Sequence, residues 1–142
     1  MLGTTRYLTL KGARKMMDAA EAEAGKHGWN VAIAIVDAAA NLILFERLDD
    51  TQPGSIDVAL GKARTAANFK RPTKALEDLV LSGRTMFLAI DGVAPMQGGV
   101  PVVVDGKVVG AVGVSGVTAA QDEQVALAAV SALSGGAAPE AR

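Results

Sequence analysis

The sequence contains no cysteine, and this absence excludes several classes of site at once. Disulfides, thiolate metal centres, iron–sulfur clusters and cysteine nucleophiles all need that side chain. His27 is the single histidine, so a zinc site or a Ser-His-Asp triad would have to depend on it alone. Aromatic residues make up only 4% of the chain. The core must therefore be built from Ala, Val, Leu, Ile and Met, which offer few large walls for a buried porphyrin.

An excess of charge of one sign and long apolar runs are also missing. Fourteen Lys and Arg residues stand against fifteen Asp and Glu residues, and the two signs are interspersed. Nucleic-acid-binding proteins carry a basic surface, which this composition does not predict. The apolar runs are shorter than the ~20 residues of a membrane helix, and the first ten residues lack the apolar segment of a signal peptide. We expect no nucleic-acid or membrane partner and a cytoplasmic location.

The chain that remains is hydrophobic and has the length of one domain. Half of its 142 residues are hydrophobic, and its mean hydropathy is +0.28. A domain of this size buries only about two thirds of its unfolded surface, so contacts between subunits are expected to cover part of the excess. We predict one domain over residues 1–136, followed by a disordered tail over residues 137–142.

Apolar periodicity predicts a helix over residues 9 to about 26 and a β-hairpin after it. Thr9 can cap the start of this helix, and Gly28 can supply the left-handed conformation that ends it. The apolar runs Val31–Val36 and Leu42–Leu48 then predict two buried strands. In the turn between them, Asn41 is the residue expected to take a positive φ.

Two helices and a second hairpin are predicted in the middle of the chain. Ser55 is expected to cap a helix that carries Asp57 in its first turn and ends before Pro72, after which Thr73 begins a second helix. Residues 100–104 and 108–115 are rich in Val and predict two strands, and the Asp-Gly pair at 105–106 between them is typical of a hairpin turn.

The last predicted helix begins at Thr118 and ends near residue 133. Gln121 follows Thr118 by three residues, the spacing of a capping box. The order is therefore helix, hairpin, two helices, hairpin, helix. This order predicts an α+β fold with one antiparallel sheet and helices on its faces, not a parallel βαβ fold.

Several residues could carry chemistry, and each also has a structural interpretation. His27 could bind heme iron or act as a base, but its place at a helix end favours hydrogen bonds to the last carbonyls. Lys62 rises beside apolar residues, so its stem is expected to cover the core while its charge reaches water; alternatively, a lowered pKa would let it act as a base or hold an anion. The negative charges of Asp122 and Glu123 would interact favourably with the dipole at the start of the last predicted helix.

The glycines at 110, 113 and 116 form a series that superficially resembles a nucleotide-binding loop. Their spacing and their place inside a strand do not match the dinucleotide fingerprint or a P-loop. Glycines within a strand instead indicate a bulge or the close approach of a helix or a neighbouring subunit.

Three sequence blocks together resemble the GlcG/HbpS family of heme-binding-like proteins, over nearly the whole chain. They are Val36-Asp37-Ala-Ala-Ala-Asn41-Leu with Phe45-Glu46-Arg47-Leu48-Asp49; Pro53-Gly54-Ser55-Ile56-Asp57-Val58-Ala59 through Gly61-Lys62-Ala63-Arg64-Thr65-Ala66-Ala67 to Arg71-Pro72-Thr73; and Gly98-Gly99-Val100-Pro101 with Gly110-Ala-Val-Gly113-Val-Ser115-Gly116 and Gln121-Asp122-Glu123. The first hairpin turn, often glycine-rich in the family, is Ala38-Ala39-Ala40 here. The second helix and second hairpin also hold no histidine that could act as an axial ligand.

The resemblance implies a fold, an assembly and a range of ligands. The fold is a profilin-like three-layer α/β/α sandwich with a five-stranded antiparallel sheet, and the assembly is a homo-oligomer, which we expect to be a tetramer or octamer. Family members include proteins linked to glycolate and propanediol utilisation and a secreted heme-binding redox sensor. Heme or a corrinoid is the cofactor that this resemblance suggests, and no His or Cys metal site is expected.

Two functions follow from these patterns. The first is a small-molecule-binding accessory protein of a catabolic pathway, which holds heme, a corrinoid or a small carboxylate in a groove near a subunit interface. The alternative is a cofactor-independent isomerase, tautomerase or hydratase that acts on a small carboxylate, with Lys62, Asp122 and Glu123 as catalytic candidates. The candidate ligand-binding residues are Asp57, Lys62, Arg71, Gly98, Gly99 and Ser115. We expect an anion near Lys62 and no heme bound through His27.

Overall fold

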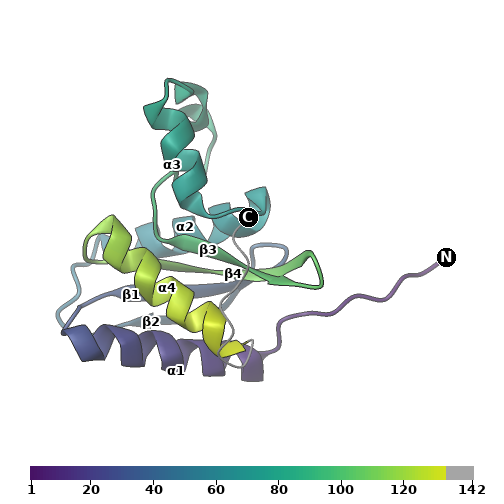
Figure 1. Ribbon diagram of the computed structural model, residues 1–142, viewed down its shortest axis with the longest axis horizontal. Coiled ribbons are helices and arrows are strands. Elements are labelled where there is room, and N and C mark those ends of the chain that lie inside the picture. The colour runs from purple at the N-terminus through teal and green to yellow at the C-terminus, as the bar shows by residue number, and fades with distance from the viewer. Residues whose placement is uncertain (134–142) are drawn as a thin grey trace.

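One four-stranded antiparallel sheet forms the centre of the computed structural model, which describes residues 1–133 (Figure 1). The elements are α1 (Leu10–His27), β1 (Ala32–Asp37), β2 (Leu42–Arg47), α2 (Ser55–Phe69), α3 (Thr73–Leu81), the 3-10 helix η1 (Thr85–Ala89), β3 (Gly99–Val104), β4 (Lys107–Ser115) and α4 (Ala119–Leu133). This order of helices and hairpins confirms the α+β prediction. The end of the predicted domain at residue 136 and the predicted tail lie outside the described residues.

The strands lie in the order β2-β1-β4-β3, so the two hairpins meet at the centre of the sheet where β1 pairs with β4. The five-stranded sheet implied by the resemblance is therefore wrong for the described residues, which form four strands. The reason lies in the sequence. The runs of strand-forming residues are those of the two hairpins, and the fifth strand rested on the resemblance alone.

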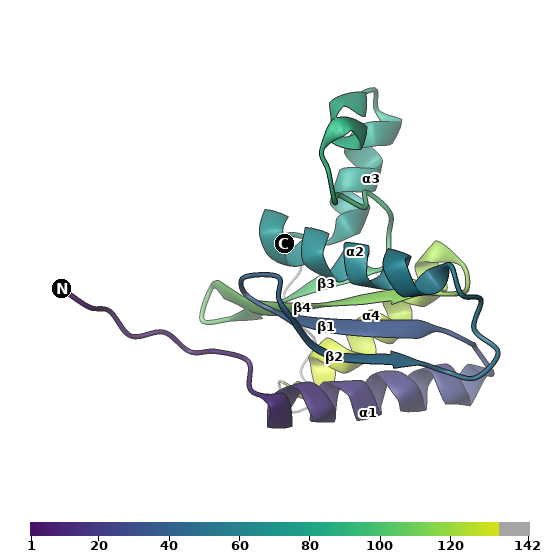
Figure 2. The same cartoon turned by 180° about the vertical axis from the view of Figure 1, so that it is seen from behind.

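Helices cover the two faces of the sheet unequally. Helices α1 and α4 lie side by side on one face, and α2 lies on the other (Figures 1 and 2). Helix α3 and η1 continue from the end of α2 and stand away from the sheet (Figure 2). We refer to residues 73–96, which comprise α3, η1 and the following loop, as the arm.

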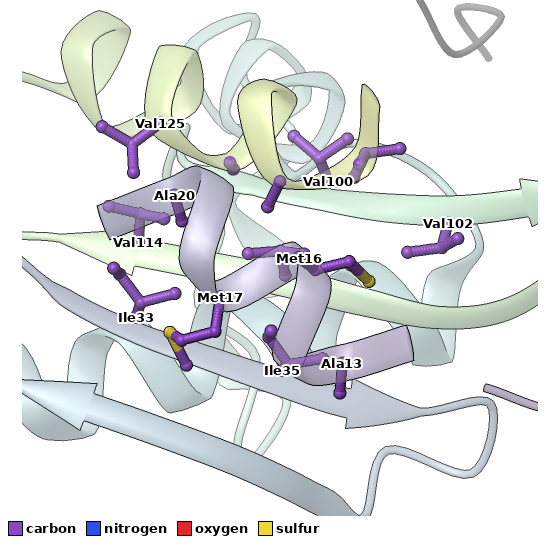
Figure 3. Close-up of a cluster of buried hydrophobic side chains, with 14 of the residues drawn as sticks. Ala13, Met16, Met17, Ala20, Ile33, Ile35, Val100, Val102, Val114 and Val125 are labelled. Atoms are coloured by element: carbon purple, nitrogen blue, oxygen red, sulfur yellow. The ribbon is translucent and has the colours of Figure 1, made fainter. Parts of the chain in front are cut away.

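The larger core lies between the sheet and the pair α1 and α4. Met16 and Met17 of α1 face Ile33 and Ile35 of β1, and Val125 of α4 packs in the same cluster (Figure 3). These side chains are at most 3% exposed. Alternate residues of β1 point to this face, as the pleat of a strand requires.

The core on the other face is made almost entirely of alanine. Ala32 and Ala34 of β1 face Ala59, Ala63 and other small residues of α2. Small side chains let the helix approach closely. A Cβ atom added at Gly113 of β4 would collide with the Ala59 carbonyl oxygen and the backbone of Ala63. The prediction that a strand glycine marks the close approach of a helix is confirmed there.

Two details of the predicted turns and caps are wrong. In the first hairpin the positive φ falls on Ala40, at 65°, and not on Asn41. The reason is Asp37, whose Oδ1 accepts hydrogen bonds from the backbone N–H groups of Ala39 and Asn41 and fixes the turn. Ser55 is likewise the first residue of α2, and Gly54 holds the cap position.

The other predicted termini are confirmed. The Thr9 hydroxyl accepts from the Gly12 N–H at 3.0 Å, and Gly28 ends α1 with φ 70°. Thr118 and Gln121 exchange two backbone-to-side-chain hydrogen bonds of 3.3 Å, which make the predicted capping box. Asp105-Gly106 forms the second hairpin turn with positive φ at both residues.

Candidate ligand groove

An open groove of about 660 Å³ lies between α2, α3 and the loop after η1. Its described lining residues are Asp57, Val58 and Gly61 of α2; Glu77, Val80 and Leu81 of α3; Leu88 of η1; and the loop residues Gly92, Val93, Ala94, Pro95 and Met96. Most of these side chains are apolar. The volume falls within the range of about 300–1,000 Å³ that is typical of small-molecule sites.

Side chains from the helices hold the loop that forms one wall of the groove. The Ala94 N–H donates to Thr65 Oγ1 of α2 at 2.9 Å. The Gln97 N–H donates to Glu77 Oε1 of α3 at 3.2 Å. Backbone groups of an irregular loop need such partners because no ladder satisfies them. The wall is therefore tied to both helices that form the rest of the groove.

The chain then passes from the loop into β3 through two glycines that leave no room for a side chain. A Cβ atom at Gly98, where φ is 132°, would lie 2.7 Å from Lys62 Nζ. One at Gly99 would lie 2.7 Å from the Thr73 methyl group and collide with the Lys62 carbonyl oxygen. The Gly99 N–H donates to Thr73 Oγ1 at 2.8 Å. These glycines serve close packing against α2 and α3.

Lys62 and Asp122 form a buried ion pair behind this passage. Lys62 Nζ donates to Asp122 Oδ2 at 3.1 Å and to the Val114 carbonyl oxygen at 2.9 Å, and the two residues are 3% and 2% exposed. The prediction that the Lys62 ammonium reaches water is therefore wrong. Its stem does not extend along the core to the surface, because a carboxylate and a carbonyl oxygen receive the ammonium inside.

Burial raises the pKa of Asp122 above its usual range, while the Lys62 charge and the Val117 N–H oppose that rise. Asp122 Oδ1 accepts from the Val117 N–H at 3.1 Å, so the carboxylate also holds the loop between β4 and α4. The pair thus joins α2, β4 and α4 at one point.

The structure brings most of the predicted site residues to one region, but only one of them into the groove lining. Lys62, Gly98, Gly99 and Asp122 lie together, and Ser115 follows Val114 there, its hydroxyl 3.4 Å from Ser55 Oγ.

The remaining predicted residues are distributed differently. Glu123 accepts a hydrogen bond from the Gln97 side chain at 3.2 Å. Asp57 lines the groove. Arg71 lies beyond the far end of α2, where its Nε donates to the Phe69 carbonyl oxygen.

The residues that sequence reasoning missed are Thr65, Thr73, Glu77 and Gln97, which hold the wall of the groove. Glu77 could have been found from the sequence. Val80 and Leu81 follow it by three and four positions, so its charge lies beside apolar side chains on one face of the helix. The roles of the two threonines depend on contacts with residues more than twenty positions away, which no local pattern reports.

His27 is the last residue of α1, and this helix lies on the face of the sheet opposite α2 (Figure 2). Its Nε2 lies 3.0 Å from Glu23 Oε2, and its ring stacks on Trp29 with centroids 4.2 Å apart. The expected hydrogen bonds to the last helix carbonyls are replaced by this carboxylate, which lies one turn earlier on the same helix. That heme does not bind through His27 stays a prediction.

The chain matches the family model described as haem degrading protein HbpS-like over residues 8–131. This chain belongs to the HbpS-like family. It is 45% identical to protein GlcG of Escherichia coli strain K12 over 112 residues, which are 79% of this chain and 84% of that protein. Among the helices of residues 1–133, none is long and apolar enough to cross a membrane, and no group of three or more His, Cys, Asp or Glu side chains there could hold a metal ion.

Two solved structures share this fold. A double mutant of Streptomyces reticuli HbpS superposes with a TM-score of 0.85 at 35% identity, over 92% of this chain and 89% of that chain. A complex of PduOC with heme superposes with a TM-score of 0.82 at 30% identity, over 89% of this chain and 95% of that chain. The family resemblance of the sequence is therefore confirmed.

Proposed function

We propose that this HbpS-like chain is an accessory protein that binds a planar, mainly apolar small molecule of the tetrapyrrole kind in the groove between α2 and α3. The observation that carries the proposal is the groove itself. It is large enough for such a ligand, and its walls are Val, Leu, Pro, Ala and Met side chains. The complex of PduOC with heme supports a ligand of this class.

Heme fits the groove in part. The apolar lining suits the face of the ring, and Met96 brings a thioether that is a known type of iron ligand. The propionate groups fit less well, because the two charged side chains in the described lining are the carboxylates of Asp57 and Glu77. Bound heme would supply its iron chemistry, and the chain would supply an apolar wall that excludes water from the ring.

A second proposal concerns the assembly. Five large apolar side chains of the arm are more than a third exposed: Leu81, Met86, Leu88, Ile90 and Met96. Exposed apolar surface of this kind marks interaction sites. We propose that a second copy packs on the arm and thereby encloses the groove. A tetramer or octamer, a cytoplasmic location and a role in catabolism stay predictions.

The alternative enzyme gains less support from the geometry. Lys62 and Asp122 bind each other and are buried, which favours a structural role over proton transfer. These contacts also give less support to the expected binding of a small carboxylate at Lys62, because its ammonium already donates to two oxygen atoms. Binding of an anion at Lys62 stays a prediction that calorimetry with 2-hydroxy and 2-oxo acids tests in the parent and a Lys62→Met variant.

The proposed site is tested by titrating hemin into the purified protein and following its Soret band. Gly61→Leu should weaken binding at least tenfold, because a Cβ atom there already meets the Ala94 methyl group at 3.3 Å and a longer side chain would fill the groove. Gly25→Leu is the matched control, since Gly25 lies on α1 in open space. Equal hemin binding by the parent and both variants would show that the groove is not the site.

A further inference from the structure

The charge in the groove has one sign. Asp57 and Glu77 are its two charged lining residues among those the structure describes, and no Lys, Arg or His belongs to that lining. They come from different helices, Asp57 from the first turn of α2 and Glu77 from the second turn of α3. Both carboxylates therefore lie beside the apolar walls of the same groove.

Among the described residues, neither Asp57 nor Glu77 forms an ion pair with a basic side chain. Glu77 Oε1 accepts the Gln97 N–H at 3.2 Å, a neutral donor. The basic side chain that acts electrostatically on Glu77 is Lys74, but its ammonium binds Asp78 Oδ1 at 2.9 Å and lies outside the groove lining. The groove is therefore a negative site.

Apolar walls strengthen the effect of these charges. A charge beside low-dielectric walls interacts more strongly with a guest than the same charge in open water. An anionic guest would have to lie beside two carboxylates, whereas a cation would gain from both. The two carboxylates act on the part of the ligand that enters the groove, because groups left in water are screened.

From this arrangement we propose that the groove selects its ligand by charge: it takes a flat apolar body that carries an organic cation, and it rejects the same body carrying a carboxylate. The inference rests on the proposed function, because it assigns a ligand class to the same groove. It applies equally to a tetrapyrrole, whose anionic side groups would have to point out of the groove.

The test uses two probes that share one ring and differ in charge, 2-naphthylmethylammonium and 2-naphthoate. Each is titrated into the parent by isothermal calorimetry at pH 7 and low salt. We expect the cation to bind at least tenfold more tightly than the anion. Added salt should narrow this difference, since screening weakens the charge term but leaves the apolar term.

The variant for this test is the double substitution Asp57→Asn with Glu77→Gln, which removes both charges and keeps side chains of similar shape. Glu77→Gln also keeps an oxygen acceptor for the Gln97 N–H. The matched control is Asp49→Asn with Asp50→Asn, which changes the net charge by the same amount at exposed residues outside the lining. The groove variant should lose the preference for the cation, and the control should keep it.

The possible outcomes separate this inference from the proposed function. If both probes bind with equal affinity and Gly61→Leu abolishes both, the groove is a ligand site and the charge selection is wrong. A preference for the cation that persists unchanged in the groove variant also overturns the selection by Asp57 and Glu77. If neither probe binds the parent, the charge selection is overturned, whereas hemin binding that Gly61→Leu weakens would leave the proposed function standing.

Discussion

Lys62 and Asp122 are the residues where a sequence pattern and the packed structure differ most. From the sequence, Lys62 is a charged residue on an apolar helix, so its ammonium is expected at the surface. The partner that keeps it inside, Asp122, lies sixty positions away at the start of α4. Such a pairing could not be predicted, because it depends on how α2 and α4 are placed across the sheet.

The variant Lys62→Met should therefore destabilise the fold by about 3–5 kcal/mol, because it leaves a buried carboxylate without its cation. Adding Asp122→Asn, which keeps an acceptor for the Val117 N–H, should restore part of this loss. The measurement is urea unfolding of the parent, both single variants and the double variant. If the loss of unfolding free energy in the double variant equals the sum of the two single losses, Lys62 and Asp122 do not interact as a buried pair.

The raised pKa of Glu46 should make the free energy of unfolding depend on pH. It lies on β2 opposite α1, and burial together with the Glu21 and Asp18 carboxylates raises its pKa above the ordinary 4.5. A raised pKa means that the folded state holds this proton more tightly than the unfolded chain. The stabilisation is thus present in full below about pH 4.5 and is lost as pH rises through the folded-state pKa.

This dependence is measured as the free energy of unfolding between pH 4 and pH 7. Asp122, whose pKa is also raised, adds a slope of the same sign, so the comparison must be with Glu46→Gln. The variant should be more stable than the parent at pH 7 and should show a shallower fall in stability. Parallel curves for the two proteins would mean that Glu46 does not titrate in this window.

At the scale of elements, the contact between α2 and the sheet depends on the absence of side chains. Gly113→Ala should cost about 1–3 kcal/mol or more, because its methyl group would collide with backbone atoms of α2 that cannot rotate away. Gly25→Ala is the control. It lies within α1 with open space around it, and should stabilise the protein by about 0.5–1 kcal/mol. A Gly113→Ala variant as stable as the parent would show that α2 can move away.

Elements with local signals were predictable, and those defined by distant contacts were not. The ends of α1, the capping box of α4 and the Asp105-Gly106 turn follow from side chains within a few residues. The positive φ of Ala40 depends on the Asp37 carboxylate, which accepts two backbone hydrogen bonds in the turn. The sequence does not reveal this, because a carboxylate at that position is compatible with several turn geometries. The groove was missed as a unit because its wall has no regular structure and its polar contacts span distant segments.

At the scale of the whole molecule, the arm stands away from the sheet (Figure 1), and its apolar side chains stay exposed among residues 1–133. We expect sedimentation velocity to show a homo-oligomer, and we expect Leu81→Lys with Leu88→Lys to dissociate it. Leu127→Lys, on an exposed position of α4, is the control and should leave the assembly intact. A parent that sediments as a 14.4 kDa monomer would remove the proposed role of the arm.

We expect the ligand to lie between α2 and α3, on the face of the sheet opposite His27. The most direct measurement is NMR of the labelled protein with ferric hemin, whose paramagnetic iron broadens the amide signals close to it. We expect broadening at Gly61, Val80 and Val93, with the signals of His27 and Trp29 unchanged. Broadening at His27 and Trp29 with the groove signals intact would contradict it.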